Sequence, residues 1–427
     1  MKVYFTRMVG RPVLARDGDR VGAVADGVLR LIDGSLPRLT GLLLRLDRSD
    51  VFISVSDVEL LADGAFQLRT GQLDTRAFER RAGEVLLDAD IRGRAVIDVE
   101  GARLVRVQDV ILEGEASRWQ VSAVVAAPPR SLSGLLWSAL GRQARGGEQI
   151  PWVRIEPLVG HVPTLGRGLP FARLAKLRPA DIADIVEAAS HDEGEQIMTA
   201  VQHDPEFEAD VFEELSEDKQ LEFLNARSDQ DAANVLANMN PDDAADLLTK
   251  LSQPRRRPIL EALPAEQQAK VRALLGYGGD TAGGLMSNEF VALPDHLSVA
   301  AALEHLGRLP DEAHVLSVLY CLHDGVLSGS ITLAHLLRCA PGASLGEVAE
   351  ADPVAVYANA DVPQVAVEMA DYNLLALPVV DAEGHILGVI THDDLLEAIL
   401  PEEWRWRGRA QHARGEEASP GRVPIGG

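Results

Sequence analysis

Cysteines, aromatic residues and long apolar runs are all scarce in this chain of 427 residues. The two cysteines, Cys321 and Cys339, are too few for a disulfide framework or a cysteine-rich zinc site. Aromatic residues make up only 4% of the sequence, so Leu, Val and Ala must fill most of the cores. No run approaches the roughly 18 apolar residues of a membrane-spanning helix, and the N-terminus lacks the apolar segment of a secretory signal. We therefore expect a cytoplasmic protein without a transmembrane segment.

Basic residues are also in short supply, because 41 Lys and Arg stand against 65 Asp and Glu. The formal charge of −24 excludes a broad nucleic-acid surface, which needs clustered cations, and favours cations as partners. The sequence also lacks the histidine spacing of zinc proteases, a nucleophile elbow and a phosphate-binding loop. We therefore expect a protein that is not an enzyme.

Residues 1–165 have the alternation and turn chemistry of β-structure, in two similar passes. The first pass contains VGRPVLARDGDRVGAVADGVLRL, in which an Asp-Gly-Asp turn separates two valine-rich runs. The second pass contains IRGRAVIDVEGARLVRVQDVILE, with a comparable turn. This duplication predicts tandem small β-barrels over residues 1–80 and 81–165. The first pass resembles PRC-barrel domains and the second does so more loosely, which implies docking modules without chemistry of their own.

Residues 172–275 change to short amphipathic helices that share one pattern. LSEDKQLEFLNAR, SDQDAANVLANM and NPDDAADLLTKL each begin with a capping residue, place acids in the first turn and continue with apolar residues at helical spacing. The repeat of about 12–13 residues predicts an all-α superhelix. Residues 177–250 hold 20 acidic and 4 basic residues, a net charge of −16. This charge indicates either a solvated acidic face or a surface that divalent cations hold against another domain.

Residues 276–400 are predicted to be α/β and duplicated, with a helix, a strand, a turn, a strand and a helix in each copy. The second copy contains LPVVDAEGHILGVITHDD, from Leu377 to Asp394. This motif resembles the CBS domain, so the duplication resembles a CBS pair, a module that often senses adenine nucleotides. We expect residues 401–427 to form a disordered tail.

The nucleotide contacts that the resemblance implies are Thr391, Asp393 and Asp394 at the start of the last helix. A hydroxyl and a carboxylate at this spacing suit a phosphate and a ribose. The same residues also fit a helix-capping box, and the sequence leaves both interpretations open. In the first copy, His335 stands where the acid is expected, so at most one site for an ATP-type or AMP-type nucleotide is predicted.

The order of these parts is similar to the cytosolic region of MgtE-type magnesium transporters. The resemblance covers residues 172–400, and its most specific motifs are NPDDAADLL and the junction GYGGDTAGGLM. It implies an MgtE-N-like acidic helical domain at 172–275, followed by the CBS pair at 276–400. The apolar spans of the family's membrane pore are not found, so we expect no transport by this chain alone.

The resemblance further implies Mg²⁺ ligands on facing acidic surfaces. Asp242 and Asp246 lie one helical turn apart, with Asp243 beside them, and Mg²⁺ prefers such oxygen ligands. Asn373 and Pro363 occupy positions where the family pattern has acids, which implies fewer ligands. The full implied set lies on the helical domain and the second CBS copy: Asp242, Asp243, Asp246, Asp371, Asp394 and Glu397.

The sequence thus predicts a multidomain cytosolic regulator that binds Mg²⁺ between its acidic helical domain and its CBS pair. A nucleotide in the CBS cleft would tune the response, and the β-domains would present it to a partner. CBS pairs usually dimerise, so the resemblance implies a homodimer, and a separate membrane transporter is a further possible partner. The alternative hypothesis is a protein-docking scaffold whose CBS pair serves only for dimerisation.

The segment PRRRP at 254–258 places three arginines between two prolines within the acidic helical region. A helix boundary is the simplest interpretation of this segment. Docking to an acidic face is the other.

Overall fold

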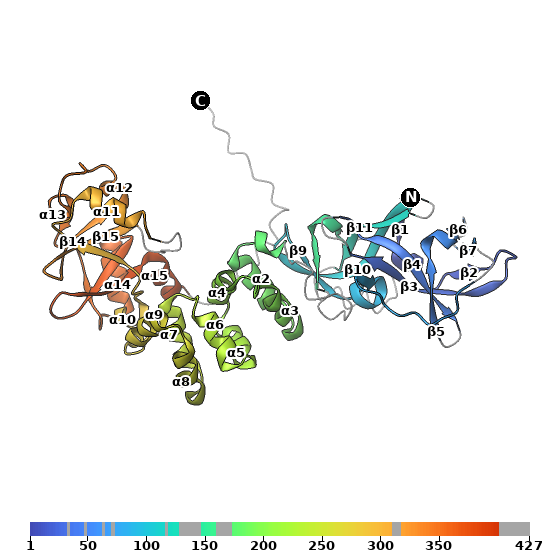
Figure 1. Cartoon of the computed structure of the whole chain (residues 1–427), viewed down its shortest axis with the longest axis horizontal. Helices are drawn as coiled ribbons and strands as arrows, with labels where there is room; N and C mark the ends of the chain where they lie inside the picture. The colour runs from blue at the N-terminus through green and yellow to red at the C-terminus, as the bar shows by residue number, and fades with distance from the viewer. Residues whose placement is uncertain are drawn as a thin grey trace, which may run out of the picture. The chain divides into compact units, whose positions relative to one another are not determined.

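The computed structural model describes residues 1–31, 35–46, 49–61, 65–69, 73–115, 118–127, 147–158, 173–309 and 317–400 (Figure 1). The expected tail at 401–427 lies outside these residues. The chain divides into two units, one built on Met1–Leu215 and the other on Ser216–His412. Within the described ranges, no helix combines the length and the apolar character that crossing a membrane requires.

The described β-structure of the first unit is one 13-stranded sheet. Its two longest strands are β3 (Arg20–Arg30) and β10 (Arg103–Glu115). The other strands are β1 (Lys2–Tyr4), β2 (Pro12–Leu14), β4 (Arg38–Leu46), β5 (Ser49–Ser54), β6 (Val58–Leu60), β7 (Phe66–Leu68), β8 (Glu84–Leu86), β9 (Ala95–Asp98), β11 (Arg118–Ala126), β12 (Gln149–Pro151) and β13 (Ile155–Pro157). Short helical turns connect them: η1 (Phe5–Arg7), η2 (Val55–Asp57), η3 (Leu87–Ile91) and η4 (Trp152–Arg154).

The two sequence repeats exchange their first strands. β1, which opens the first repeat, pairs with β10 of the second, and β8, which opens the second repeat, pairs with β3 of the first. One hydrophobic core extends across both repeats, from Phe5 to Ile155. The two repeats thus form one sheet and not two separate ones, and the expected tandem arrangement of PRC-barrel-like domains stays a prediction. Repeats with the same pattern carry no signal for whether a strand pairs within its own repeat or with the other one.

In each repeat, a buried aspartate stabilises this strand exchange through hydrogen bonds to the other repeat. Asp26 on β3 accepts hydrogen bonds from the backbone N–H groups of Asp88 (2.7 Å) and Ala89 (3.1 Å) in the η3 turn. Asp109 on β10 accepts from the backbone N–H (3.0 Å) and the hydroxyl of Thr6 in the η1 turn. Burial raises the pKa of Asp26 to about 6, although these hydrogen bonds oppose the shift. The sequence motifs Ala-Asp-Gly-Val and Gln-Asp-Val-Ile thus hold the opposite repeat in place.

Short helices follow the sheet and confirm the predicted repeat. The first unit contains η5 (Leu174–Lys176), α2 (Pro179–Ala188), α3 (His191–Val201) and α4 (Pro205–Glu213). The second unit begins with α5 (Glu217–Ala226), α6 (Asp229–Leu236), α7 (Pro241–Lys250), α8 (Gln253–Ala262) and α9 (Ala265–Leu274). The five helices from α5 to α9 start at intervals of 12 residues. Within this set, α5 packs on α7, α6 on α8 and α7 on α9, which is the arrangement of a helical superhelix.

The remainder of the second unit is a pair of similar α/β copies. The first contains β14 (Val291–Pro294), α11 (Val299–Leu306), β15 (Val318–His323), β16 (Val326–Thr332), α12 (Leu333–Leu336), α13 (Leu345–Val348) and β17 (Glu350–Ala351). The second contains β18 (Val356–Tyr357), α14 (Val362–Asp371), β19 (Ala376–Val380), β20 (Ile386–Thr391) and α15 (His392–Ile399). In both copies a parallel strand pair is followed by an antiparallel hairpin, as the predicted duplication requires.

The segment between the superhelix and these copies packs on the second copy. Its helix α10 (Ala282–Leu285) starts with Ala282 and Gly283, whose N–H groups donate to the carbonyls of Ala360 and Ala358, both at 2.8 Å. Ser287 exchanges two backbone hydrogen bonds with Val389 of β20. A Cβ atom on Gly284 would lie 2.2 Å from the carbonyl oxygen of Gly278, so only glycine fits this close approach. These residues form a tight entry to the second copy.

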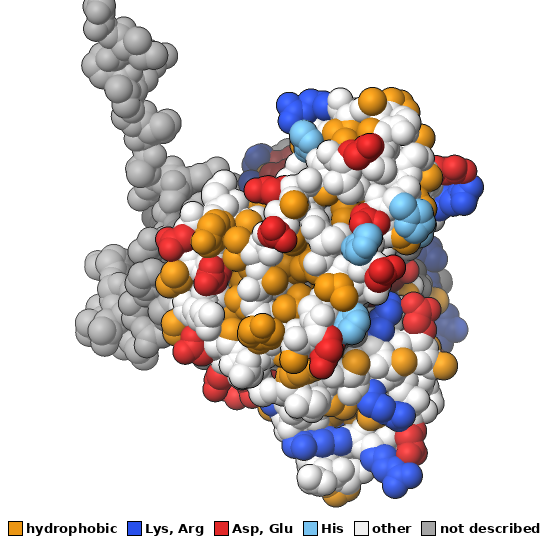
Figure 2. Space-filling view, turned by 90° about the vertical axis from the view of Figure 1, so that its left-hand side faces the viewer, with side chains coloured by type: hydrophobic (Ala, Val, Ile, Leu, Met, Phe, Trp, Pro, Cys, Tyr) orange, Lys and Arg blue, Asp and Glu red, His pale blue; other side chains and the backbone are white. Residues whose placement is uncertain are grey.

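An apolar surface remains uncovered on the second unit. Apolar side chains gather in the middle of the face that Figure 2 shows. The helices α14 and α15 pack against each other, and apolar side chains on them and beside them are exposed. The exposed side chains on and beside these two helices are Val367, Tyr372, Leu375, Leu396, Ile399 and Leu400.

Candidate metal site

Two acidic side chains in the first turns of two helices are close enough for one to raise the pKa of the other. Asp242 lies in the first turn of α7, and Asp394 lies in the first turn of α15. The helix α10 contacts both α7 and α15, so the junction segment packs against both helices. Acids at helix N-termini are stabilised by the helix dipole, which explains their place in each sequence pattern.

Asp242 carries an unsatisfied oxygen. Its Oδ1 atom is buried and has no hydrogen-bond partner among the described residues. Burial, together with the negative charges of Asp394, Asp246 and Glu289, raises the pKa of Asp242 to about 7. A backbone hydrogen bond to the Asp242 carboxylate opposes this shift. A buried carboxylate oxygen without a partner is unfavourable unless the group takes up a proton or a cation.

The pKa values of two neighbouring acids, Asp394 and Asp246, are raised as well. Burial raises the pKa of Asp394, and its hydrogen bonds with Thr391 oppose this shift. Burial also raises the pKa of Asp246, which Lys250 counteracts and Glu217 reinforces. Asp394 and Asp246 both repel ionised Asp242, so a divalent cation would relieve this repulsion.

Nearby lysines are already engaged by other acids. Lys270 Nζ lies 2.9 Å from Glu289 and 3.2 Å from Glu266. Lys250 Nζ lies 2.8 Å from Glu217. The negative charge of Asp242 and Asp394 is therefore not neutralised by a direct ion pair with either lysine.

Sequence reasoning missed two residues of the junction segment. Glu289 acts electrostatically on Asp242, and the neighbouring Asn288 has a buried Oδ1 atom without a partner in the described part of the chain. The Asn288 side-chain nitrogen donates to the carbonyl of Lys270 at 3.1 Å. The sequence offered one signal for them, an acid shortly after the GYGGDTAGGLM motif. Their place near the site could not be predicted, because it depends on the long-range pairing of Ser287 with Val389.

The other predicted metal ligands lie outside this electrostatic set. Asp243 is half-buried in the first turn of α7, next to Asp242. Asp371 is exposed at the end of α14, and Glu397 is exposed on α15. None of the three is among the charges that raise the pKa of Asp242. Their role as ligands stays a prediction.

Thr391 and the acids after it form the capping box that the sequence allowed. The Thr391 hydroxyl lies 2.6 Å from Asp393 Oδ1 and 2.7 Å from Asp394 Oδ2, and the Thr391 backbone N–H donates to Asp394 Oδ2 at 2.9 Å. In the first copy, the hydroxyl of Thr332 accepts the backbone N–H of His335, but no acid completes a box. The capping role is thus present, and nucleotide contact stays a prediction.

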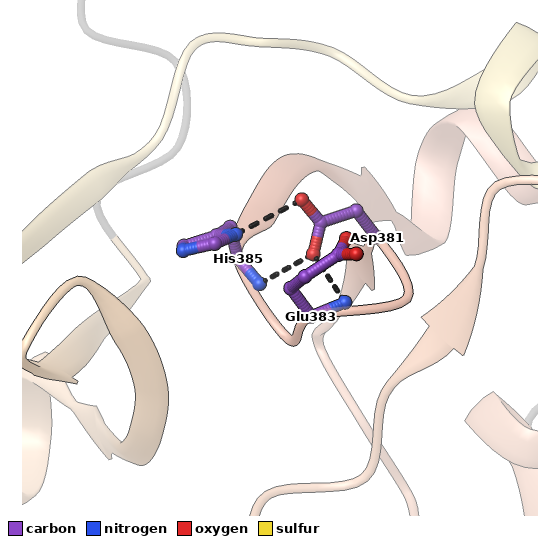
Figure 3. A group of neighbouring side chains, drawn as sticks. All are labelled: Asp381, Glu383 and His385. Atoms are coloured by element: carbon purple, nitrogen blue, oxygen red, sulfur yellow. Dashed lines mark hydrogen bonds and ion pairs between the residues drawn. The ribbon is translucent and has the colours of Figure 1, made fainter.

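A second group of possible metal ligands, Asp381, Glu383 and His385, lies at the turn between β19 and β20 (Figure 3). Asp381 Oδ1 accepts the backbone N–H groups of Glu383 (3.0 Å) and His385 (2.8 Å), and Asp381 Oδ2 lies 3.0 Å from His385 Nδ1. These bonds close the hairpin turn without an ion. The group therefore has a sufficient structural explanation, unlike the unpartnered oxygen of Asp242.

Comparison with protein families defines the class of the region around the candidate site. Residues 177–280 match the MgtE intracellular N domain, and residues 345–401 match the CBS domain. Neither is a family of enzymes. This part of the chain is homologous to the cytosolic region of MgtE magnesium transporters, and the PRC-barrel identity of the β-rich first 165 residues stays a prediction.

Individual relatives agree with this class. The magnesium transporter MgtE of Thermus thermophilus is 31% identical over 198 residues, which cover 45% of this chain and 44% of the relative. MgtE of Bacillus subtilis is 27% identical over 194 residues, with 45% and 43% covered. The chain thus spans less than half of the length of these curated relatives.

Two solved structures match the same region. The cytosolic domain of the Mg²⁺ channel MgtE in complex with ATP superposes with a TM-score of 0.50 and 29% identity, covering 53% of this chain and 92% of that chain. The soluble part of a magnesium transporter gives a TM-score of 0.50 and 26% identity, covering 53% and 90%.

Proposed function

We propose that this chain is a cytosolic Mg²⁺-responsive regulatory protein whose ion is held between the first turns of α7 and α15. The buried, unpartnered Oδ1 of Asp242 beside the charge of Asp394 carries this proposal for the described residues. Mg²⁺ binds through few carboxylates and keeps several waters, so it does not need a closed protein cage. We infer that Asp246 and Glu289 add negative charge to this site, and Asp243 remains a further candidate ligand.

The ion would control how closely the superhelix approaches the second CBS copy. Without Mg²⁺, ionised Asp242, Asp246, Asp394 and Glu289 repel one another, which favours separation of the two surfaces. With Mg²⁺, the same carboxylates share a cation and hold the surfaces together. The β-rich unit, as a docking module, would present this change to a protein partner or to a separate membrane transporter.

An adenine nucleotide in the cleft of the CBS pair is the second ligand of this proposal. The similar MgtE cytosolic domain whose structure contains ATP supports it. Thr391, Asp393 and Asp394 are the contacts that we infer for this chain. Asp394 belongs to both inferred sites, so occupancy of one site would affect the other.

Small-angle scattering of the full chain tests the proposed closure. We expect a smaller radius of gyration in millimolar Mg²⁺ than in EDTA, because the ion removes the repulsion that separates the two surfaces. Sodium chloride at matched ionic strength should not reproduce this decrease. Superimposable scattering curves with and without Mg²⁺ would contradict the closure.

The exposed apolar face on α14 and α15 favours a second candidate role, a scaffold that dimerises through its CBS pair. Exposed apolar patches of this kind mark protein contacts. We expect Leu396→Asp combined with Ile399→Asp to shift the protein from dimer to monomer in light scattering, because the two carboxylates would place charge in the proposed apolar contact. Both side chains are nearly half exposed, at 46% and 47%.

Leu337→Asp is the matched control for the dimer test, since Leu337 is 64% exposed on the first copy. The same mass for the original protein and the double variant would rule out dimerisation through this face. A dimer that does not respond to Mg²⁺ would favour the scaffold over the sensor.

A further inference from the structure

The arginines of the PRRRP segment occupy an unfavourable place in their helix. α8 starts at Gln253, so Arg255, Arg256 and Arg257 stand at its third to fifth positions. Positive charge near a helix N-terminus opposes the helix dipole. The segment starts α8 as predicted, but the helix continues through Pro258. The three arginines therefore require an explanation beyond helix formation.

Two of the three arginines have structural roles. Arg255 donates to the carbonyls of Leu224 (2.8 Å) and Arg227 (2.9 Å) at the end of α5. Arg256 donates to the carbonyls of Leu251 (2.7 Å) and Thr249 at the end of α7. Both guanidinium groups thus satisfy carbonyls that helix ends leave open.

The third arginine lies beside a pocket. Arg257 is paired with Glu261 at 2.6 Å, and the two side chains are 84% and 55% exposed. An ion pair this exposed contributes little to stability, so a carboxylate from a ligand can replace Glu261. Arg272 on α9 is exposed, and within the described part of the chain it makes no hydrogen bond or ion pair.

The pocket is lined by both basic and apolar side chains, together with Thr249 and Glu261. It has a volume of about 530 Å³ and lies between the end of α7, α8 and the end of α9. Arg256, Arg257 and Arg272 form its positive groups, and Leu248, Leu260 and Leu275 line it. Residues 251–275 contain 5 basic and 2 acidic residues, in contrast to the net charge of −16 over residues 177–250. An acidic ligand is repelled by the preceding helices and attracted here.

We propose that this pocket binds an acidic, leucine-bearing segment of a partner protein. Guanidinium groups recognise planar carboxylates through paired hydrogen bonds, which explains arginine in the pocket in place of lysine. The leucine side chains of the pocket take an apolar side chain, which a free phosphate does not supply. This inference does not depend on the Mg²⁺ site, because none of its residues belongs to that site.

Fluorescence anisotropy with the full chain tests this proposal. The probe is a short labelled peptide with glutamates and leucines at helical spacing, and the control peptide has glutamine in place of each glutamate. We expect saturable binding of the acidic peptide alone, weakened by added salt. Arg257→Glu combined with Arg272→Glu should weaken it by about tenfold or more.

Arg308→Glu is the matched control, since Arg308 is 75% exposed and paired with Glu304 in the same way. Both variants remove exposed side chains, and thermal unfolding verifies that they stay folded. No saturable binding of the acidic peptide, or equal weakening by both variants, would overturn the proposal. Binding of inorganic phosphate or ATP to the pocket without binding of the peptide would also overturn it.

Discussion

Asp242→Asn is expected to make the Mg²⁺-free protein more stable at about pH 8 and less responsive to Mg²⁺. The amide removes a buried negative charge that faces Asp394, Asp246 and Glu289. Because the pKa of Asp242 is raised to about 7, and each pKa unit corresponds to about 1.4 kcal/mol, the gain is of the order of a few kcal/mol. Chemical unfolding in EDTA and in Mg²⁺ measures both effects.

The pH dependence follows from the direction of this shift. A carboxyl whose pKa is raised on folding binds its proton more tightly in the folded state, so stability falls as the pH rises. For Asp242 this loss begins near its ordinary pKa of 3.8 and is complete above about 7. The amide side chain of the Asp242→Asn variant cannot titrate, so the difference between the two proteins should grow across this window.

Asp218→Asn is the matched control for Asp242→Asn. Asp218 occupies the same position in α5 as Asp242 does in α7, but it is exposed. It should change neither the stability in EDTA nor the response to Mg²⁺. An Asp242→Asn protein that is less stable at about pH 8 and is stabilised by Mg²⁺ as before would contradict the proposed site.

Asp26→Ala is expected to destabilise the β-rich unit by about 2–4 kcal/mol. The substitution leaves the N–H groups of Asp88 and Ala89 without their acceptor and loosens the exchanged strand β8. Thermal unfolding with separate probes for the two units measures the loss. The unfolding temperature of the CBS-containing unit should not change.

Asp19→Ala serves as the control for Asp26→Ala, because Asp19 is exposed in the turn before β3. We expect Asp19→Ala to leave the unfolding temperature of the β-rich unit unchanged. Equal transitions for the Asp26→Ala protein and this control would show that the buried aspartate does not fasten the repeats.

The local features of the fold could be predicted from the sequence. Capping residues such as Ser216 and Ser228 start α5 and α6, and their hydroxyls accept the N–H groups of Lys219 and Asp231. The hairpin of the second CBS copy follows its alternating pattern and turn. These elements depend on interactions between residues that are close in sequence.

The long-range features could be predicted only in part. Asp242 and Asp394 were expected together because of a family resemblance, and the charge of Asp394 raises the pKa of Asp242. Glu289 was missed because its position depends on the packing of the junction segment against β20. The exchange of β1 and β8 was missed because two repeats with one pattern do not specify which of them a strand joins.

Calorimetric titration of Mg²⁺ into the EDTA-stripped full chain tests the central claim most directly. We predict saturable binding near pH 7 with release of protons, because Asp242 must lose its proton before it can bind the ion. Repeating the titration in buffers with different heats of ionisation measures the protons released. Absence of saturable heat at millimolar Mg²⁺, or binding without proton release, would contradict a site at Asp242.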